Sequence, residues 1–283
     1  MGKEILSLLQ RDIMLGFYSI RYRWLFSMGV ILMMLLFSLY DLIQSAPIVG
    51  YNRSTFTYTD LLFPVFKGEE FQMPGDPGAK FPVPWFFMQI IGPFIFGGYM
   101  REDFFQQSSF LFIRAKHRFS IWISKLIFAV VVVLSMYLLI AVMTALLSFS
   151  FLSFSPAWSD YGEKEILPKL SLELSLFAFT IHMLLLPFCM TVFTVIIQAV
   201  LSVFMRPIYA FLVIAALLAV SVYSTSRFLP GSYSMILRNE AMAPGIGYSW
   251  GLLFIYIAFV LLAVVCGGYM LFKKMDIFPK EGD

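Results

Sequence analysis

Six long apolar runs, separated by short polar segments, constrain this chain more than any other feature. They cover residues 24–42, 83–100, 120–152, 174–204, 207–226 and 249–272. A helix of about 20 mostly apolar residues crosses the hydrocarbon core of a bilayer, and these runs have about that length or more. Backbone polar groups inside a bilayer must be hydrogen-bonded within the protein, which favours helices. The sequence therefore predicts an all-α, polytopic membrane protein in which residues 1–283 form one domain with six transmembrane helices.

The composition excludes several other classes of protein. Hydrophobic residues make up 60% of the chain and charged residues only 13%, far from the usual values for a soluble domain. The lipid bilayer is therefore the expected surrounding, and a net charge of +3 gives no reason to expect a nucleic-acid partner. Cys189 and Cys266 lie inside apolar runs, without the spacing of a disulfide framework or a metal site.

The first 23 residues have the pattern of an amphipathic helix. Polar residues such as Lys3, Gln10 and Arg21 fall on one side of this helix. Apolar residues recur at helical spacing on the other side, at Ile5, Leu8, Leu9, Ile13, Phe17 and Ile20. We expect residues 1–23 to lie along the membrane surface. The alternative is a frayed cytosolic end.

The distribution of positive charge predicts the orientation of the spans. With the amino terminus inside, thirteen of the 20 Lys and Arg residues fall on the inner side. They are Lys3, Arg11, Arg21, Arg23, Arg101, Arg114, Lys116, Arg118, Lys125, Arg206, Lys273, Lys274 and Lys280. Positive charge concentrates on the cytoplasmic side of membrane proteins. An even number of spans then places both termini in the cytoplasm and the chain in the cytoplasmic membrane.

The sequence lacks the motifs of the common membrane-bound enzymes. It has neither the phosphate-binding pattern G-x-x-x-x-G-K-[ST] nor HExxH, and its two histidines, His117 and His182, are far apart. We therefore predict no catalytic, cofactor-binding or metal-binding residue, and no enzymatic activity in this chain. His182, alone in the fourth span, is expected to bond to a neighbouring helix.

The segment between the second and third spans carries an ordered set of charges. Glu102 and Asp103 come first, where the dipole of a following helix favours negative charge. Phe104 and Phe105 begin an apolar face, so this segment is predicted to be a short helix at the inner surface. The basic residues Arg114, Lys116, Arg118 and Lys125 follow. We expect Lys125 to anchor the third span by reaching back to the lipid headgroups. An ordinary positive-inside loop is the alternative.

This order of charges resembles the membrane subunits of type-2 ATP-binding-cassette (ABC) exporters. In that family an acidic residue ends the second span, a cytoplasmic coupling helix follows, and a lysine enters the third span. Glu102 or Asp103, Arg118 and Lys125 match those places. The resemblance extends to the amino-terminal surface helix, the six spans, a re-entrant-looking outer segment before the last span and the basic residues that leave the last span. Gln107-Ser108 stands where the family often has Gly-Thr, and no Pro precedes Arg118, so the register of the coupling helix is open by one turn.

The resemblance implies a permease that works with separate ATPase subunits. Two ABC ATPase chains, which bind ATP and Mg, would contact Glu102, Asp103, Phe104, Phe105, Arg114, Lys116 and Arg118. A second permease, identical or different, would complete the unit, with the second and fifth spans lining a central path. Ala215 and Ala219 in the fifth span allow close helix approach, which favours helix packing, with a place on the translocation path as the alternative.

The function implied is export of a hydrophobic or amphipathic substrate, such as a peptide, an antibiotic or a lipid-like molecule. The alternative is a non-ABC polytopic protein, either an ion-coupled carrier or an intramembrane enzyme. The sequence leaves open the identity of the substrate, the choice between a homodimer and a heterodimer, and the choice between export and a regulatory or immunity role.

Overall fold

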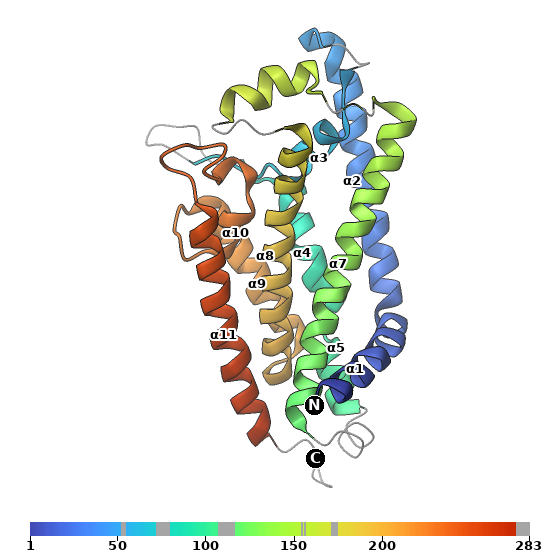
Figure 1. Cartoon of the computed structure of the whole chain (residues 1–283), viewed down its shortest axis with the longest axis vertical. Helices are drawn as coiled ribbons and strands as arrows, with labels where there is room; N and C mark the ends of the chain where they lie inside the picture. Colours follow the sequence, from blue (N-terminus) through green and yellow to red (C-terminus); the bar gives the residue numbers. More distant parts are fainter. Residues whose placement is uncertain are drawn as a thin grey trace.

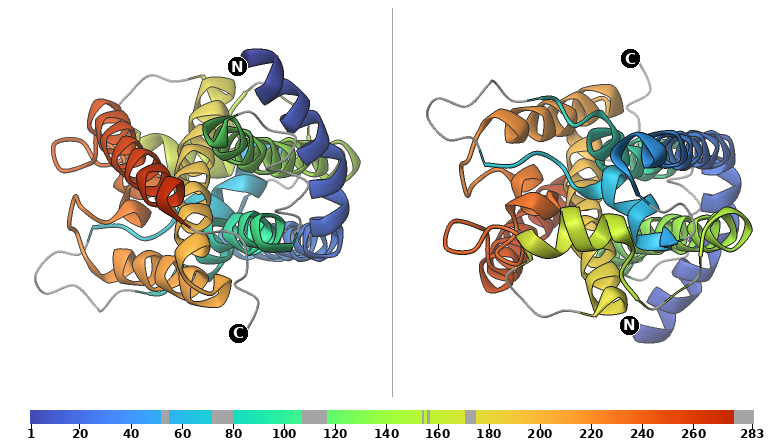
Figure 2. Two further views of the ribbon diagram at one scale, coloured as in Figure 1. Left: turned by 90° about the horizontal axis from the view of Figure 1, so that it is seen from below. Right: turned by 90° about the horizontal axis from the view of Figure 1, so that it is seen from above.

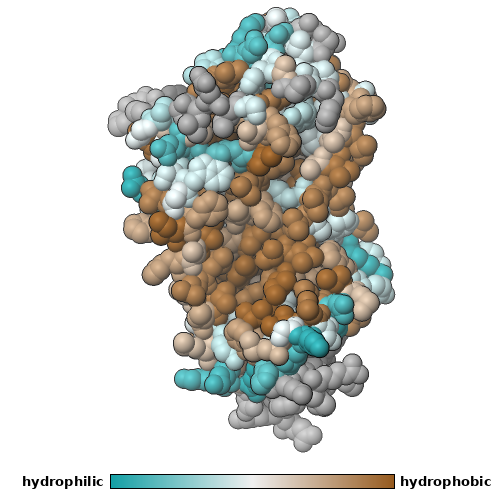
Figure 3. All heavy atoms as spheres, viewed as in Figure 1, coloured by the Kyte–Doolittle hydropathy of each residue, from teal (hydrophilic) through white to brown (hydrophobic). Residues whose placement is uncertain are grey.

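The computed structural model describes residues 1–51, 55–71, 80–106, 117–153, 155, 157–170 and 175–275 of the chain. These residues form a bundle of helices that run along one long axis (Figure 1). On the face shown in Figure 3, apolar side chains cover the middle of the bundle and polar ones gather at both ends. The prediction of an all-α fold embedded in a membrane is therefore confirmed.

Five helical segments are long and apolar enough to cross a membrane, by length and composition. They are Gly2–Ser45, Val83–Phe105, Arg118–Phe151, Leu176–Phe204 and Trp250–Lys274. The fifth predicted span is a shorter apolar helix, α9 (Pro207–Tyr223), whose 17 residues rise about 26 Å at 1.5 Å per residue. A polytopic architecture with about five candidate spans is therefore confirmed, and α9, the fifth of the six predicted spans, is shorter than the length criterion for a span.

The amino-terminal helix continues into the first span through a π-helical turn. Its three parts are α1 (Gly2–Arg11), η1 (Asp12–Gly16) and α2 (Phe17–Val49). The amphipathic pattern is present, because Leu8 and Leu9 pack on the core while Lys3 is exposed. A π turn holds an extra residue and rotates the side chains that follow. Here Asp12 is buried, whereas the neighbouring Ile13 is 38% exposed.

The second predicted span is broken into two helices. α4 (Val83–Phe96) ends at Gly97, and α5 (Tyr99–Gln106) begins after a two-residue turn. Gly97 has φ 42° and ψ −118°, a backbone conformation that residues with a Cβ atom rarely adopt. A Cβ atom on Gly97 would also lie 2.5 Å from Nη1 of Arg23. The turn between α4 and α5 therefore requires glycine at this position.

Replacing Gly97 with Ala should lower the free energy of unfolding by about 1–3 kcal/mol, because the strained φ angle and the contact with Arg23 both penalise a Cβ atom. The matched control is Gly29→Ala, because Gly29 lies inside α2 with no atom within 4 Å of an added Cβ. That control should be neutral or slightly stabilising. The melting temperatures of both variants are measured by thermal unfolding in detergent micelles. Equal melting temperatures would contradict the expected strain of a Cβ atom at position 97.

The remaining long helices pack around α8 (Leu176–Phe204). α7 (Arg118–Phe151), α4, α9 and α11 (Trp250–Lys274) all contact α8, and the end views show it between them (Figure 2). Met183, Met190 and Ala199 of α8 are fully buried. α8 is therefore the central helix of the bundle.

Short elements close the end of the bundle that lies opposite Met1 and the end of α11 (Figure 1). They are α3 (Tyr58–Phe66), η3 (Gly162–Ile166), η4 (Leu167–Lys169), α10 (Pro230–Ser234) and η5 (Ile236–Arg238). All five residues of α10 are buried, and α10 packs on α8 and α9. The segment between α9 and α11 therefore turns back into the bundle before the last helix begins. His182 of α8 bonds to Asn239 of this segment at 3.2 Å, not to a neighbouring helix as predicted.

Arg238 joins three parts of this end of the bundle. Its guanidinium donates to the carbonyl oxygens of Ser221 (2.8 Å), Val222 (2.6 Å) and Ser224 (3.1 Å), where α9 ends. Its Nε also donates to the carbonyl of Glu69, at 3.0 Å. Arg238 is 1% exposed, and this burial lowers the pKa of its guanidinium. The side chain caps α9 and connects it to the segment that follows α3.

Candidate functional site

A cluster of buried charges lies where α1, η1, α5 and α7 meet, at the end of the bundle that holds Met1. Each element contributes at least one polar side chain to it: Arg11, Asp12, Tyr99, Asp103, Ser124 and Lys125. We call these six residues the ionic cluster. They come from three regions of the sequence: Arg11 precedes Asp103 by 92 positions and Asp12 precedes Lys125 by 113, whereas Tyr99 precedes Lys125 by only 26. The folding of α5 and of the π turn against α7 is what brings them together.

Lys125 is the centre of the ionic cluster. Its Nζ lies 2.5 Å from Oδ1 of Asp12 and 2.6 Å from Oδ2 of Asp103. The hydroxyl oxygen of Tyr99 is 3.2 Å away from the same nitrogen. The side chain of Lys125 is 0% exposed, and those of Asp12 and Asp103 are 1% and 5% exposed. An ammonium group with three donors therefore has three acceptors in a site that excludes solvent.

Arg11 and Ser124 complete the hydrogen bonding of the two carboxylates. Arg11 donates from Nη2 to Oδ1 of Asp103 at 2.9 Å and from Nη1 to Oδ2 at 3.2 Å, a bidentate pair. Ser124 Oγ donates to Oδ2 of Asp12 at 3.0 Å. Two cations and two carboxylates give the ionic cluster a formal charge of zero. Burial of such a group is tolerated only when every charge is paired and hydrogen-bonded, as it is here.

Glycine and aromatic side chains allow the approach of the helices around the ionic cluster. A Cβ atom on Gly16 would lie 2.5 Å from Cζ of Phe128 and 3.0 Å from the hydroxyl of Tyr99. Phe128 packs on Tyr99 with ring centroids 5.0 Å apart, and on Phe17 in an edge-to-face arrangement at 5.5 Å. The absence of a side chain at Gly16 therefore lets η1 lie directly against α7, which places Asp12 beside Lys125.

Lys125 does not lie where the sequence predicted. It was expected to reach the lipid headgroups, but its side chain is enclosed by Asp12, Asp103 and Tyr99. The reason is that η1 and α5 bring two carboxylates to the lysine, and pairing inside the protein replaces hydration at the membrane surface. The pairing of Asp103 with both Lys125 and Arg11 also turns this carboxylate inward.

The other residues predicted to contact an ATPase are divided between the surface and the core. Glu102 is 40% exposed at its side chain and lies 3.3 Å from Arg23. Phe105 is 40% exposed, whereas Phe104 is buried and stacks on Phe272 with centroids 4.7 Å apart. Arg114 and Lys116 lie outside the described residues.

Two arginines at this end cap helices, in the same way as Arg238 at the other end. Nη1 of Arg118 donates to the carbonyl oxygens of Lys273 (3.0 Å) and Met275 (3.2 Å), where α11 ends. Nη1 of Arg101 lies 3.1–3.4 Å from the carbonyl oxygens of Ser202, Val203 and Met205, where α8 ends. Sequence reasoning assigned Arg118 to a partner and gave Arg101 no role. The sequence signal for such capping would have been a cationic residue beside the predicted end of an apolar helix.

Ala215 and Ala219 are both partly buried on α9, which packs against α8 and α4. Their position is compatible with helix packing. Among the residues that the structure describes, no group of three or more His, Cys, Asp or Glu side chains could hold a metal ion. The ionic cluster has its charges satisfied internally, so its chemistry is that of a fixed connection between helices.

Comparison with known families gives one match. A family model described as "Protein of unknown function (DUF2705)" matches residues 30–278, most of the chain. The chain belongs to the DUF2705 family. No curated protein and no solved structure matches the chain. The matched range of this DUF2705 protein includes Tyr99, Asp103 and Lys125 and begins after Arg11 and Asp12.

Proposed function

We propose that this DUF2705 protein is the permease subunit of an ATP-driven exporter of the type-2 ABC class, with both termini in the cytoplasm. It would move a hydrophobic or amphipathic substrate across the cytoplasmic membrane. The energy would come from two copies of a separate ATPase that binds ATP and Mg. A second permease, identical or different, would complete the transporter.

The observation that carries the proposal is the ionic cluster. A permease that is driven by another protein needs a firm connection between the surface that its partner contacts and the helices that cross the membrane. The ionic cluster joins α5 to α7 through Asp103 and Lys125, and joins both to the amino-terminal helix through Arg11 and Asp12. A displacement of α5 would therefore be transmitted to α7 and to α1 together.

The exposed face of α5 is the natural contact for such a partner. Glu102 and Phe105 are the exposed members of the predicted contact set on α5, while Asp103 and Phe104 face inward. The turn at Gly97 ends α4, so α5 begins as a separate short helix at this end of the bundle. The segment that turns back between α9 and α11 also agrees with the resemblance to type-2 exporters.

Co-purification of the partner tests the proposal. The tagged chain, isolated from native membranes, should carry an ATPase that contains the phosphate-binding motif. The double variant Glu102→Lys/Phe105→Ala should reduce the amount of that ATPase about tenfold, because it reverses a charge and removes an aromatic contact. Asp103 is left unchanged, since replacing it would disrupt the ionic cluster itself.

The matched control for this experiment is Glu163→Lys/Phe228→Ala. Both residues are exposed at the opposite end of the bundle, and Phe228 is 83% exposed. This control should retain the ATPase at the level of the unchanged chain. Absence of any ATPase from the unchanged chain would overturn the proposed function, and equal retention in both variants would overturn the assignment of α5 as the contact.

The buried charges give one specific argument for the alternative, an ion-coupled carrier. Ionisable residues inside membrane helices often belong to proton or ion pathways. Against this, Asp12 and Asp103 are each engaged by a cation and a further donor or second cation, so neither carboxylate has an open position for an ion. Transport that persists after ATP depletion and follows an imposed pH gradient would favour the carrier.

A further inference from the structure

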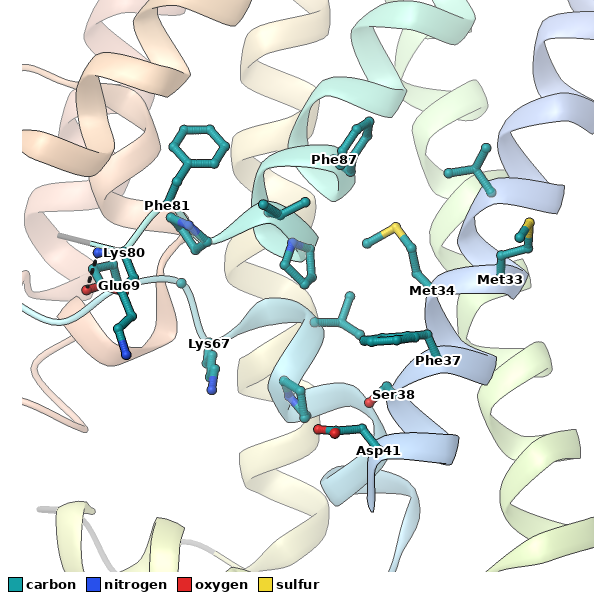
Figure 4. A pocket seen from close by; sticks show the side chains of 17 residues that line it. Met33, Met34, Phe37, Ser38, Asp41, Lys67, Glu69, Lys80, Phe81 and Phe87 are labelled. Atoms are coloured by element: carbon teal, nitrogen blue, oxygen red, sulfur yellow. Dashed lines mark hydrogen bonds between the residues drawn. The ribbon is translucent and has the colours of Figure 1, made fainter. Parts of the chain in front are cut away.

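A groove of about 700 Å³ opens between α2, α3 and α4 (Figure 4). Its walls are mostly apolar and include Val30, Met33 and Phe37 of α2 and Phe87 of α4. Along α2 the lining runs from Val30 to Asp41, a rise of about 16 Å at 1.5 Å per residue. Both helices belong to candidate membrane spans, so this part of the groove lies at the depth of the hydrocarbon.

Charged residues line one end of the groove only. Asp41, Lys67, Glu69 and Lys80 are all at that end, and in Figure 4 the side chains of Lys67 and Lys80 point the same way, toward the Asp41 end. Among the residues that the structure describes, neither lysine ammonium has a carboxylate within 4.0 Å, and the carboxylate of Asp41 has no cation within that distance. The only contact drawn between them joins the backbone N–H of Lys80 to Oε1 of Glu69, at 3.2 Å.

The backbone that carries Lys67 is held in place by the rest of the protein. The carbonyl of Lys67 accepts a hydrogen bond from the N–H of Leu237 at 3.0 Å, and the carbonyl of Glu69 accepts one from Arg238. Gly68 between them has a φ of 71°, which only glycine adopts easily. The backbone of residues 67–69 at the charged end of the groove is therefore positioned before any ligand binds, which reduces the entropy lost on binding.

We propose that this groove binds a zwitterionic phospholipid from the surrounding bilayer. The acyl chain would lie along Met33, Phe37 and Phe87, and the phosphate would lie between Lys67 and Lys80, with the ammonium group of the headgroup facing Asp41. The four charged side chains sum to zero, and a headgroup with one phosphate and one ammonium matches both signs. A purely anionic or purely cationic amphiphile would leave one sign without a partner. This inference does not depend on the proposed function.

Native mass spectrometry of the purified chain tests the binding directly. The protein in detergent is offered equal amounts of phosphatidylethanolamine and phosphatidylglycerol. The unchanged chain should retain phosphatidylethanolamine in preference, and Lys67→Ala/Lys80→Ala should lower that adduct about tenfold through loss of the phosphate contacts. Asp41→Asn should remove the preference between the two lipids. The matched control is Lys164→Ala, an exposed lysine outside the groove, which should leave the adduct unchanged.

Two results would overturn the proposal. The first is equal or greater retention of phosphatidylglycerol by the unchanged chain, or retention that is insensitive to both lysines. The second comes from cysteines placed at Phe37 and Phe87 in a background without Cys189 and Cys266. Efficient disulfide cross-linking between two chains at these positions would place a second copy of the protein in the groove instead of a lipid, whereas labelling by a photoactivatable lipid at the same positions supports the proposal.

Discussion

Replacing Lys125 with Met is expected to destabilise the protein by about 3–5 kcal/mol, because it leaves two buried carboxylates with one cation between them. Lys125 is 0% exposed, and its ammonium contacts Asp12 and Asp103 at 2.5 and 2.6 Å. Water cannot replace it without opening the packing of η1 against α7. For a chain of this size the melting temperature in detergent should fall by on the order of 10 °C.

The double variant Asp12→Asn/Lys125→Met separates charge balance from simple loss of packing. It removes one cation and one anion, and it keeps the bidentate pair of Arg11 and Asp103. Its melting temperature should therefore lie closer to that of the unchanged chain than does the temperature of Lys125→Met alone. If the two substitutions instead destabilise additively, so that the double variant is less stable than Lys125→Met alone by the whole effect of Asp12→Asn, the ionic cluster is not held by mutual neutralisation.

Replacing Arg238 with Ala should have an effect of similar size at the opposite end, about 3 kcal/mol or more. The carbonyls of Ser221, Val222 and Ser224 lose their donor in a buried place, and each unsatisfied polar group costs about 1–3 kcal/mol. Arg238→Lys should recover only part of the loss, because one ammonium group cannot reproduce the planar guanidinium that reaches both α9 and Glu69.

Arg227→Ala is the matched control, since Arg227 lies on the same connection and is exposed. It should change the melting temperature little. Limited proteolysis provides a second readout, because loss of the Arg238 contacts should release the segment between α9 and α11. Identical melting temperatures and cleavage patterns for Arg227→Ala and Arg238→Ala would contradict a capping role.

The spans were predictable because hydrophobic length is a local property of the sequence. α7, α8 and α11 begin and end within about two residues of the predicted runs, since their ends coincide with the change from apolar to polar residues. The break at Gly97 was not predictable in the same way. Pro93 is the stronger helix breaker by sequence, yet α4 continues through it, and Gln198 donates to the Pro93 carbonyl at 3.1 Å.

The ionic cluster was only partly visible in the sequence. The resemblance drew attention to Asp103 and Lys125, but their direct contact depends on how α5 turns after Gly97. Asp12 was not singled out, although helical spacing from Leu8 and Leu9 places it on the apolar side of the amino-terminal helix, where a carboxylate needs a partner. The π turn at Asp12–Gly16 affects the residues that follow Asp12, and it was not predicted from the sequence. The contacts of Arg101, Arg118 and Arg238 were also missed. Arg101 and Arg118 cap helices that are distant in sequence, and Arg238 reaches the end of α9 only because the segment after α9 turns back.

The residues of the ionic cluster are synthesised in a fixed order, since a ribosome makes the chain from its amino-terminal side onward. Arg11, Asp12, Tyr99 and Asp103 all precede Lys125, and the nearest of its carboxylate partners is complete 22 residues before it. A lysine that enters a membrane before its counter-ions would have to stay at the surface or carry its charge into lipid alone. Here the anions are already made when the cation emerges. Lys125 is the only buried lysine among the described residues. Its carboxylate partners are therefore available to neutralise it as the third span enters the bilayer.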